Sequence, residues 1–187
     1  MLTVNFSPFP TLHTERLVLR EISHKDDEDV FLLRSNRGLM EYIDRPRAET
    51  IDDAKILVQR MMDIVAANEG ISWAITLKGS DRLIGTIGFW RLVKEHYRGE
   101  VGYMLHADYH RQGIMKEALL TAADYAFKTI KLHTIEANIN PANIPSIKLA
   151  ESVGFVREAY FKENYYYNGK FLDSAIYTLF NPYDIVT

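Results

Sequence analysis

The stretch from Glu100 to Ala118 carries the residues best suited to chemistry. An apolar strand at 100–106 runs through a short loop into a helix, and Gly113 stands where that helix begins. The first turn of a helix has unpartnered backbone N–H groups at the positive end of the helix dipole, so an anion binds there readily. Glycine lets a phosphate approach the backbone closely, and Arg111 and Lys116 add positive charge. This pattern indicates a phosphate site, although an ordinary helix start would also explain a single glycine.

Other familiar binding motifs are absent from the sequence. It contains no G-x-x-x-x-G-K-[ST], which excludes a P-loop nucleotidase, and no G-x-G-x-x-G opens the helix, so a dinucleotide site is unsupported. Among the six histidines, only His106 and His110 are four residues apart, and this pair falls in the loop before the helix rather than on a helix face; there is no cysteine. We therefore expect no metal site.

The loop and two further motifs resemble one known family. Residues 110–115, His-Arg-Gln-Gly-Ile-Met, resemble the Q/R-x-x-G-x-G/A pyrophosphate loop of the GNAT N-acetyltransferase superfamily. His110 replaces the commoner Gln or Arg, and Met115 replaces Gly or Ala. Both changes are compatible with a loop that binds phosphate through backbone N–H groups. Residues 138–155, with Asn138, Asn143, Ser146 and a Gly-Phe pair, resemble the second motif of the superfamily.

The N-terminal strand narrows the resemblance to one branch. Residues 14–20, Thr-Glu-Arg-Leu-Val-Leu-Arg, are similar to the first strand of RimJ/RimL-type enzymes, which acetylate the N-terminal amines of ribosomal proteins. The resemblance covers about residues 12–181, which is nearly the whole chain.

The resemblance implies that acetyl-CoA is the co-substrate, bound where the strands at 100–106 and 134–139 splay apart. It assigns the pantetheine arm to the amides of Asn138 and Asn143, which both donate and accept hydrogen bonds. It assigns the thioester oxygen to backbone near Met104 and Leu105. The pyrophosphate falls to the loop and helix start, which comprise His110, Arg111, Gln112, Gly113, Ile114, Met115 and Lys116.

The catalytic roles follow from the same resemblance. An attacking amine must be neutral, so a base has to take its proton. Glu100 is the candidate base, and a solvated charge at a strand end is the alternative. Many members place a tyrosine four residues before the Gly-Phe pair to protonate the leaving thiolate, but this chain has Ala150 there. The RimL-like branch uses a serine three residues after the asparagine, which is Ser146. The alternative for Ser146 is an ordinary residue in the first turn of a helix.

The acceptor is expected to be a primary amine, first of all the N-terminal α-amine of a ribosomal or other protein. A polyamine, an amino acid or an antibiotic is the alternative with the same chemistry. A non-catalytic acyl-CoA-binding module would keep the loop without the acid and base, and the presence of both Glu100 and Ser146 disfavours it. We expect no nucleic-acid or membrane partner, and a monomer or homodimer.

The strands and helices that position these residues predict a mixed α/β (α+β) fold. Alternating and helical hydrophobic patterns predict the order β-α-α-β-β-β-α-β-α-β-β, a seven-stranded, mostly antiparallel sheet flanked by about four helices. Four acids at 26–29 precede an apolar run and read as a helix start rather than a metal or amine site. The predicted strands are 17–20, 71–78, 83–93, 100–106, 134–139, 155–160 and 171–180, with long helices at 53–68, 112–130 and 143–153.

Length and composition set the outer limits. The 187 residues are 47% hydrophobic and 25% charged, which predicts one globular domain over residues 1–187. The net charge of −3 argues against a protein that depends on nucleic-acid phosphates for affinity. No targeting or membrane-spanning segment is evident, so a cytoplasmic location is expected.

Overall fold

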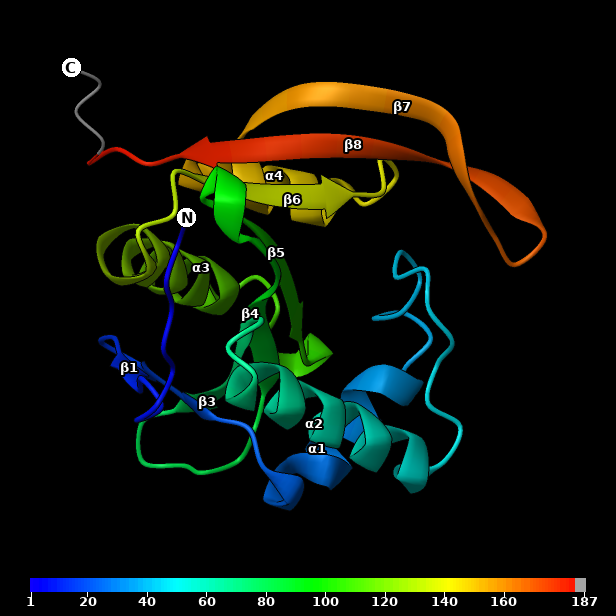
Figure 1. The fold of residues 1–187 in the computed structure, drawn as a ribbon. Helices are drawn as coiled ribbons and strands as arrows, with labels where there is room; N and C mark the ends of the chain where they lie inside the picture. Colours follow the sequence, from blue (N-terminus) through cyan, green and yellow to red (C-terminus); the bar gives the residue numbers. More distant parts are fainter. Residues whose placement is uncertain (184–187) are drawn as a thin grey trace.

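Eight strands form one sheet in the computed structural model, which describes residues 1–183 (Figure 1). Neighbouring strands are antiparallel except β5 and β6, which are parallel. The mixed α/β fold is therefore confirmed. The strands in spatial order are β1 (Leu12–His13), β2 (Leu17–Glu21), β3 (Ile71–Leu77), β4 (Gly85–Val93), β5 (Arg98–Leu105), β6 (Thr134–Ile139), β8 (Lys170–Phe180) and β7 (Val156–Tyr167).

The sheet has one strand more than the seven expected from the sequence. The addition is β1, in which Leu12 and His13 pair with Leu19 and Val18 of β2. Two residues are too few to show a period-2 hydrophobic pattern, so this edge strand could not be predicted from the sequence.

Two pairs of helices cover the two faces of the sheet (Figure 1). One face carries α1 (Asp27–Ser35) and α2 (Ile51–Ala66), and the other carries α3 (Ile114–Tyr125) and α4 (Ile144–Val153). Successive side chains of β5 point to opposite faces of the sheet, so Leu105 packs with α3 while Met104 packs with α1 and α2. In the described part of the chain, no helix has the length and apolar character that a bilayer crossing requires.

The ends of the helices follow local rules. The carboxylate of Asp26 accepts two hydrogen bonds from Arg20, at 2.6 and 2.9 Å, and one from the backbone N–H of Ser23. The acids at 26–29 thus mark a helix start, as expected. The helix predicted at 112–130 begins at Ile114, because Gly113 has φ = 76° and cannot be helical, and it ends in a π-helical turn at Ala126–Ile130.

The pairing of β5 with β6 is short. Only Arg98, Gly99 and Glu100 of β5 have partners in β6, namely Thr134, Ile135 and Glu136. Both strands continue beyond these pairs, β5 to Leu105 and β6 to Ile139, without pairing to each other. The expected splay is present, and it opens directly after Glu100.

The C-terminal hairpin is longer than expected. Strand β7 runs to Tyr167 instead of ending near residue 160, and Asn168 (φ = 48°) and Gly169 (φ = 81°) form the predicted Asn-Gly turn. Most of β7 is exposed, so its sequence lacks an alternating apolar face. Beyond β6, the hairpin continues as a curved arm at the end of the sheet (Figure 1).

Candidate active site

The start of α3 presents free backbone donors. The first hydrogen bond inside the helix runs from the N–H of Glu117 to the carbonyl of Gly113, over 3.0 Å. The N–H groups of the preceding residues have no helical acceptor, which is the normal state of a first turn. Ile114 and Met115 bury their side chains in the core. They can meet a ligand only through the backbone, as expected for Met115.

Two loop side chains brace the backbone ahead of this turn. The Nε2 atom of His110 lies 2.9 Å from the carbonyl oxygen of Leu105, and the amide of Gln112 donates to the carbonyl of Asp108 over 2.7 Å. Both side chains are occupied by the protein itself. Arg111, at φ = 59°, and Lys116 are exposed, so their charges remain open to a ligand.

A connection from the N-terminal strand also holds this turn, and sequence reasoning missed it. The carboxylate of Glu117 accepts a hydrogen bond from the hydroxyl of Thr14 and pairs with Arg16 at 2.6 Å. The same arginine donates to the carbonyl of Gln112 over 3.0 Å. Arg16 thus neutralises the one acid in the first turn of α3 and fixes the loop, which keeps this helix start suited to an anion.

The open edge of β5 lies opposite β6. The N–H of His106 donates to the carbonyl of Ile84, the residue just before β4. In an antiparallel ladder the backbone groups of every second residue point to the same neighbour, so the N–H and C=O of Met104 also point toward β4. The backbone groups of Tyr103 and Leu105 therefore face the splay, and the bond from His110 to Leu105 agrees with this. The donors nearest to a ligand in the splay are these two residues on either side of Met104.

A tyrosine and a serine meet across the splay. The hydroxyl of Tyr103 on β5 lies 2.8 Å from the Oγ of Ser146 on α4, and burial raises the pKa of this phenol. The side chain of Asn143 caps α4 by accepting from the backbone N–H of Ser146 at 3.2 Å. Its NH₂ group remains available. Nothing in the sequence pattern of β5 distinguishes Tyr103 from a core tyrosine.

Glu100 lies on the opposite face of the sheet from this pair, because Glu100 and Tyr103 are three positions apart along β5 and successive side chains of a strand point to opposite faces. It stands at the last paired position, beside Glu136 of β6, which forms an ion pair with Arg98 at 3.1 Å. Burial raises the pKa of the Glu100 carboxyl above its ordinary value, and the charge of Arg91 opposes that shift. A raised pKa suits a group that must take up a proton.

Asn138 lies on β6 two residues beyond the last pair with β5, and its side chain is exposed. Asn138 and Tyr103 are therefore on the two different strands that border the splay. Among residues 1–183, no three His, Asp or Glu side chains gather as metal ligands would.

Comparison with known proteins supports what this geometry indicates. Residues 16–156 match the acetyltransferase (GNAT) domain family. The chain belongs to the GNAT acetyltransferase family. It is 32% identical over 174 residues to the uncharacterized N-acetyltransferase YoaA of Bacillus subtilis, covering 93% of this chain and 98% of that protein. A solved GNAT-family acetyltransferase from Bacillus anthracis superposes with a TM-score of 0.82 at 29% identity, over 92% of this chain and 99% of its own.

Other relatives of this acetyltransferase have named acceptors of two kinds. A solved ribosomal-protein-S5-alanine acetyltransferase from Vibrio fischeri has a TM-score of 0.81 at 25% identity, covering 93% of this chain and 98% of its own. The spermidine N(1)-acetyltransferase of Vibrio cholerae is 24% identical over 169 residues, which is 90% of this chain and 95% of that protein. The relatives agree on N-acetyl transfer and differ in the amine.

The acetyltransferase therefore uses acetyl-CoA, and its own residues fit that co-substrate. The free N–H groups at the start of α3 suit a pyrophosphate. The unpaired edge of β5 suits the pantetheine arm of CoA, because the backbone N–H and C=O groups of the strand can pair with the amides of that arm. The splay brings Tyr103 and Ser146 to one side of the sheet and Glu100 to the other.

Proposed function

We propose that this acetyltransferase transfers the acetyl group of acetyl-CoA to a primary amine that approaches from the Glu100 face of the sheet. The observation that carries the proposal is the splay between β5 and β6, which opens at Glu100 and has the Tyr103–Ser146 pair on its other face. A base and a proton donor on opposite faces match a reaction in which the nucleophile enters from one side and the leaving group departs from the other.

Each residue has a role in this proposal. Glu100 takes the proton of the ammonium, directly or through water, and the free amine attacks the thioester carbon. The backbone N–H groups around Met104, those of Tyr103 and Leu105, stabilise the oxyanion of the tetrahedral intermediate. Ser146 donates a hydrogen bond to the departing thiolate. A phenol is a stronger acid than a serine hydroxyl, so Tyr103 rather than Ser146 is the source of the proton that passes through Ser146 to the thiolate.

The binding roles complete the proposal. The pyrophosphate lies on the backbone of residues 110–116, between the charges of Arg111 and Lys116. Asn138 and the NH₂ group of Asn143 donate to the pantetheine carbonyls. Asn143 can fill both this role and its capping role, because capping uses only its carbonyl oxygen.

For the acceptor we propose an N-terminal α-amine, as in RimJ/RimL-type enzymes, with action in the cytoplasm by a single domain spanning residues 1–187. The ribosomal-protein acetyltransferase among the relatives supports this choice. An α-amine titrates near 7.7–8.0 and a lysine amine near 10.4, so at neutral pH far more of the α-amine is already neutral and one modest base suffices. A small amine is the second candidate, and the spermidine relative favours it.

Acetyl transfer from acetyl-CoA to a panel of peptides and small amines tests the proposal. Release of CoA together with mass-confirmed acetylation of at least one amine is the expected result. The α-amine assignment requires higher kcat/KM for peptides with a free N-terminus than for the same peptides with a blocked N-terminus and a free lysine. Acetyl-CoA binding without transfer to any amine would instead indicate a non-catalytic acyl-CoA-binding module.

A further inference from the structure

The face of the sheet that carries Glu100 also carries an aromatic platform. The β-bulge in β4 falls between Phe89 and Arg91 and contains Trp90, which is 42% exposed. Its indole lies over Gly102 of β5, where an added Cβ would come within 3.3 Å of the ring. Gly102 is two residues from Glu100 on the same face, so Trp90 stands directly beside the proposed base.

An arginine rests on this platform. The guanidinium carbon of Arg45, in the connection between α1 and α2, lies 5.4 Å from the centre of the Trp90 ring. Its charge acts on two groups at once, because it lowers the pKa of Glu100 and also that of Arg34. Arg45 is therefore close enough to act on both the proposed base and a second arginine.

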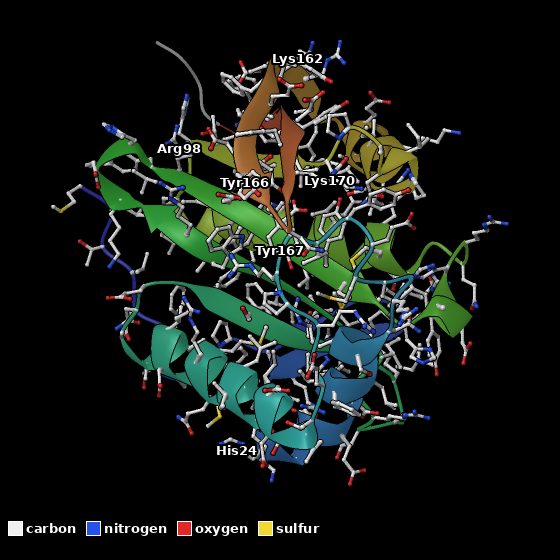
Figure 2. All side chains as sticks on the ribbon, turned by 90° about the vertical axis from the view of Figure 1, so that its right-hand side faces the viewer. His24, Arg98, Lys162, Tyr166, Tyr167 and Lys170 are labelled. Carbon is white, nitrogen blue, oxygen red and sulfur yellow. The ribbon has the colours of Figure 1, made fainter. Side chains whose placement is uncertain are left out.

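That second arginine is in the last turn of α1. The connection folds back on it, since the N–H of Ala48 donates to the carbonyl of Arg34 and Arg47 donates to the carbonyl of Ser35, both over 3.1 Å. Tyr167, at the tip of the β7–β8 hairpin, is the other titratable group that acts on Arg34. In Figure 2 this hairpin tip reaches over the middle of the molecule, beside the α1–α2 connection.

Neither arginine forms an ion pair within residues 1–183. Arg16, Arg20, Arg82 and Arg98 pair with carboxylates, whereas no carboxylate is within 4.0 Å of the Arg34 or Arg45 guanidinium, and several other arginines of the described chain are likewise unpaired. Asp44 is not such a partner, because burial raises its pKa and no nearby cation lowers it. Burial and the nearby charge of Arg45 lower the pKa of Arg34, so both effects disfavour its charged form.

Two neighbouring cations repel each other, and an arginine fork matches a carboxylate or phosphate in geometry and charge. The negative end of the α1 dipole would explain Arg34 alone, but it does not explain why Arg45 is held beside it. Resting on the proposed function, we propose that the acceptor carries an oxyanion, a carboxylate or a phosphate, close to the amine that is acetylated. Arg34 and Arg45 bind the oxyanion while the amine meets Glu100.

This arrangement selects among amines by charge. The alkyl part of such an acceptor can lie along the exposed edge of the Trp90 indole, beside Arg45. A polyamine would place its second ammonium against two guanidinium groups and is disfavoured. Acidic or phosphorylated small amines fit, as do peptides with an acid next to the N-terminal residue.

Matched acceptor pairs test this inference. One pair is an amino acid and its amide, another is an aminoalkyl phosphate and the corresponding amino alcohol, and a third is a peptide with Asp or Asn at its second position. The amide of an amino acid has more free amine at neutral pH, because a carboxylate stabilises the neighbouring ammonium. Intrinsic reactivity therefore opposes the expected preference. In at least one pair, we expect the compound with the oxyanion to have about ten- to hundredfold higher kcat/KM than its neutral counterpart. The neutral compound cannot make the charged hydrogen bonds to the arginines.

Variants connect that preference to the two arginines. Arg45→Met and Arg34→Met should each reduce the ratio within the pair to about threefold or less, mainly through KM, while acetyl-CoA affinity stays unchanged. Arg60→Met, which removes an exposed charge from α2, is the matched control and should keep the full ratio.

The outcomes separate this inference from the proposed function. Equal kcat/KM within all pairs, or faster acetylation of spermidine, would overturn the oxyanion inference and leave acetyl transfer intact. If no amine is acetylated, the proposed function fails. Calorimetry with CoA and N-acetylated compounds then still tests the oxyanion site. Tighter binding of an N-acetylamino acid than of its amide, with the difference lost in Arg45→Met, supports the site. Equal binding of the two compounds contradicts it.

Discussion

The phenol oxygen of Tyr103 on β5 and the hydroxyl oxygen of Ser146 on α4 are 2.8 Å apart. Within the described residues each is the other's side-chain partner. The serine expected to act alone therefore belongs to a pair, and the tyrosine supplies the more acidic proton.

Removing either hydroxyl should slow acetyl transfer. Ser146→Ala should lower kcat by about tenfold or more, because a donor to developing charge acts mainly in the transition state. The free energy of unfolding should change by less than about 1 kcal/mol, since one part-buried hydrogen bond is lost. Tyr103→Phe should have a similar effect on kcat. Steady-state kinetics and a binding titration on the same samples measure these effects.

The double variant distinguishes a pair from two separate residues. If Tyr103 and Ser146 act as a unit, the double variant should lose no more activity than the worse single variant. Losses that multiply would show independent roles. Unchanged turnover with weaker acetyl-CoA binding would make Ser146 a pantetheine contact.

Glu100→Gln should lower kcat/KM by roughly 10²–10⁴ if this carboxylate is the general base. The deficit should shrink as pH rises, because the amine then deprotonates unaided. The wild-type rate should rise with pH through a pKa above the usual glutamate range, given that burial raises it. A loss below about threefold at every pH would leave Glu100 as a strand-end charge.

The same substitution should affect stability in the opposite direction. The pKa of Glu100 is higher in the folded than in the unfolded state, so ionisation costs folding free energy at neutral pH. Glu100→Gln should therefore be more stable than wild type at pH 7. The difference should vanish as pH falls below the unfolded pKa, near 4.3, where both states hold the proton. Thermal unfolding across this pH range measures it.

Gly113→Glu should abolish acetyl-CoA binding while the fold persists. Its side chain would place a negative charge at the helix start, where phosphate binds. Because Gly113 has φ = 76°, part of any effect is backbone strain. Gly113→Asn is the control, since asparagine tolerates this conformation and adds no charge. Calorimetry with CoA should show a much larger loss for Glu than for Asn, and equal losses would remove the loop from the site.

Arg16→Gln should weaken CoA binding by about three- to tenfold, which is of the order of 1 kcal/mol. It frees the charge of Glu117 in the first turn of α3 and releases the carbonyl of Gln112. Lys55→Gln, which breaks an exposed ion pair with Asp52 on α2, should leave the affinity unchanged. Reduced kcat at unaltered affinity would contradict a role in holding the loop.

Local signals predicted much of this fold. Gly113 and Gly154 mark helix ends, Asn143 caps α4, and Asn168-Gly169 forms the hairpin turn, all because neighbouring residues determine these features. The splay was expected from the family resemblance and is present.

Contacts between distant parts of the chain were not predictable. Thr14 meets Glu117 across 103 positions, and Tyr103 meets Ser146 across 43. Arg34 and Arg45 look like ordinary surface charges in the sequence, and the bulge that places Trp90 beside Arg45 has no local sequence signal. The length of β7 was underestimated because both of its faces are largely exposed.

Three residue pairs form the whole ladder between β5 and β6, so few backbone hydrogen bonds link the two halves of the sheet. At about 3.3 Å per residue, the seam is roughly 10 Å long. A change in the angle between the halves therefore strains few backbone hydrogen bonds, and the core that packs under both halves resists it instead. The amide hydrogens of Tyr103 and Leu105 face that opening without a strand partner, and in water they should exchange faster than those of Gly102 and Met104 on the same strand.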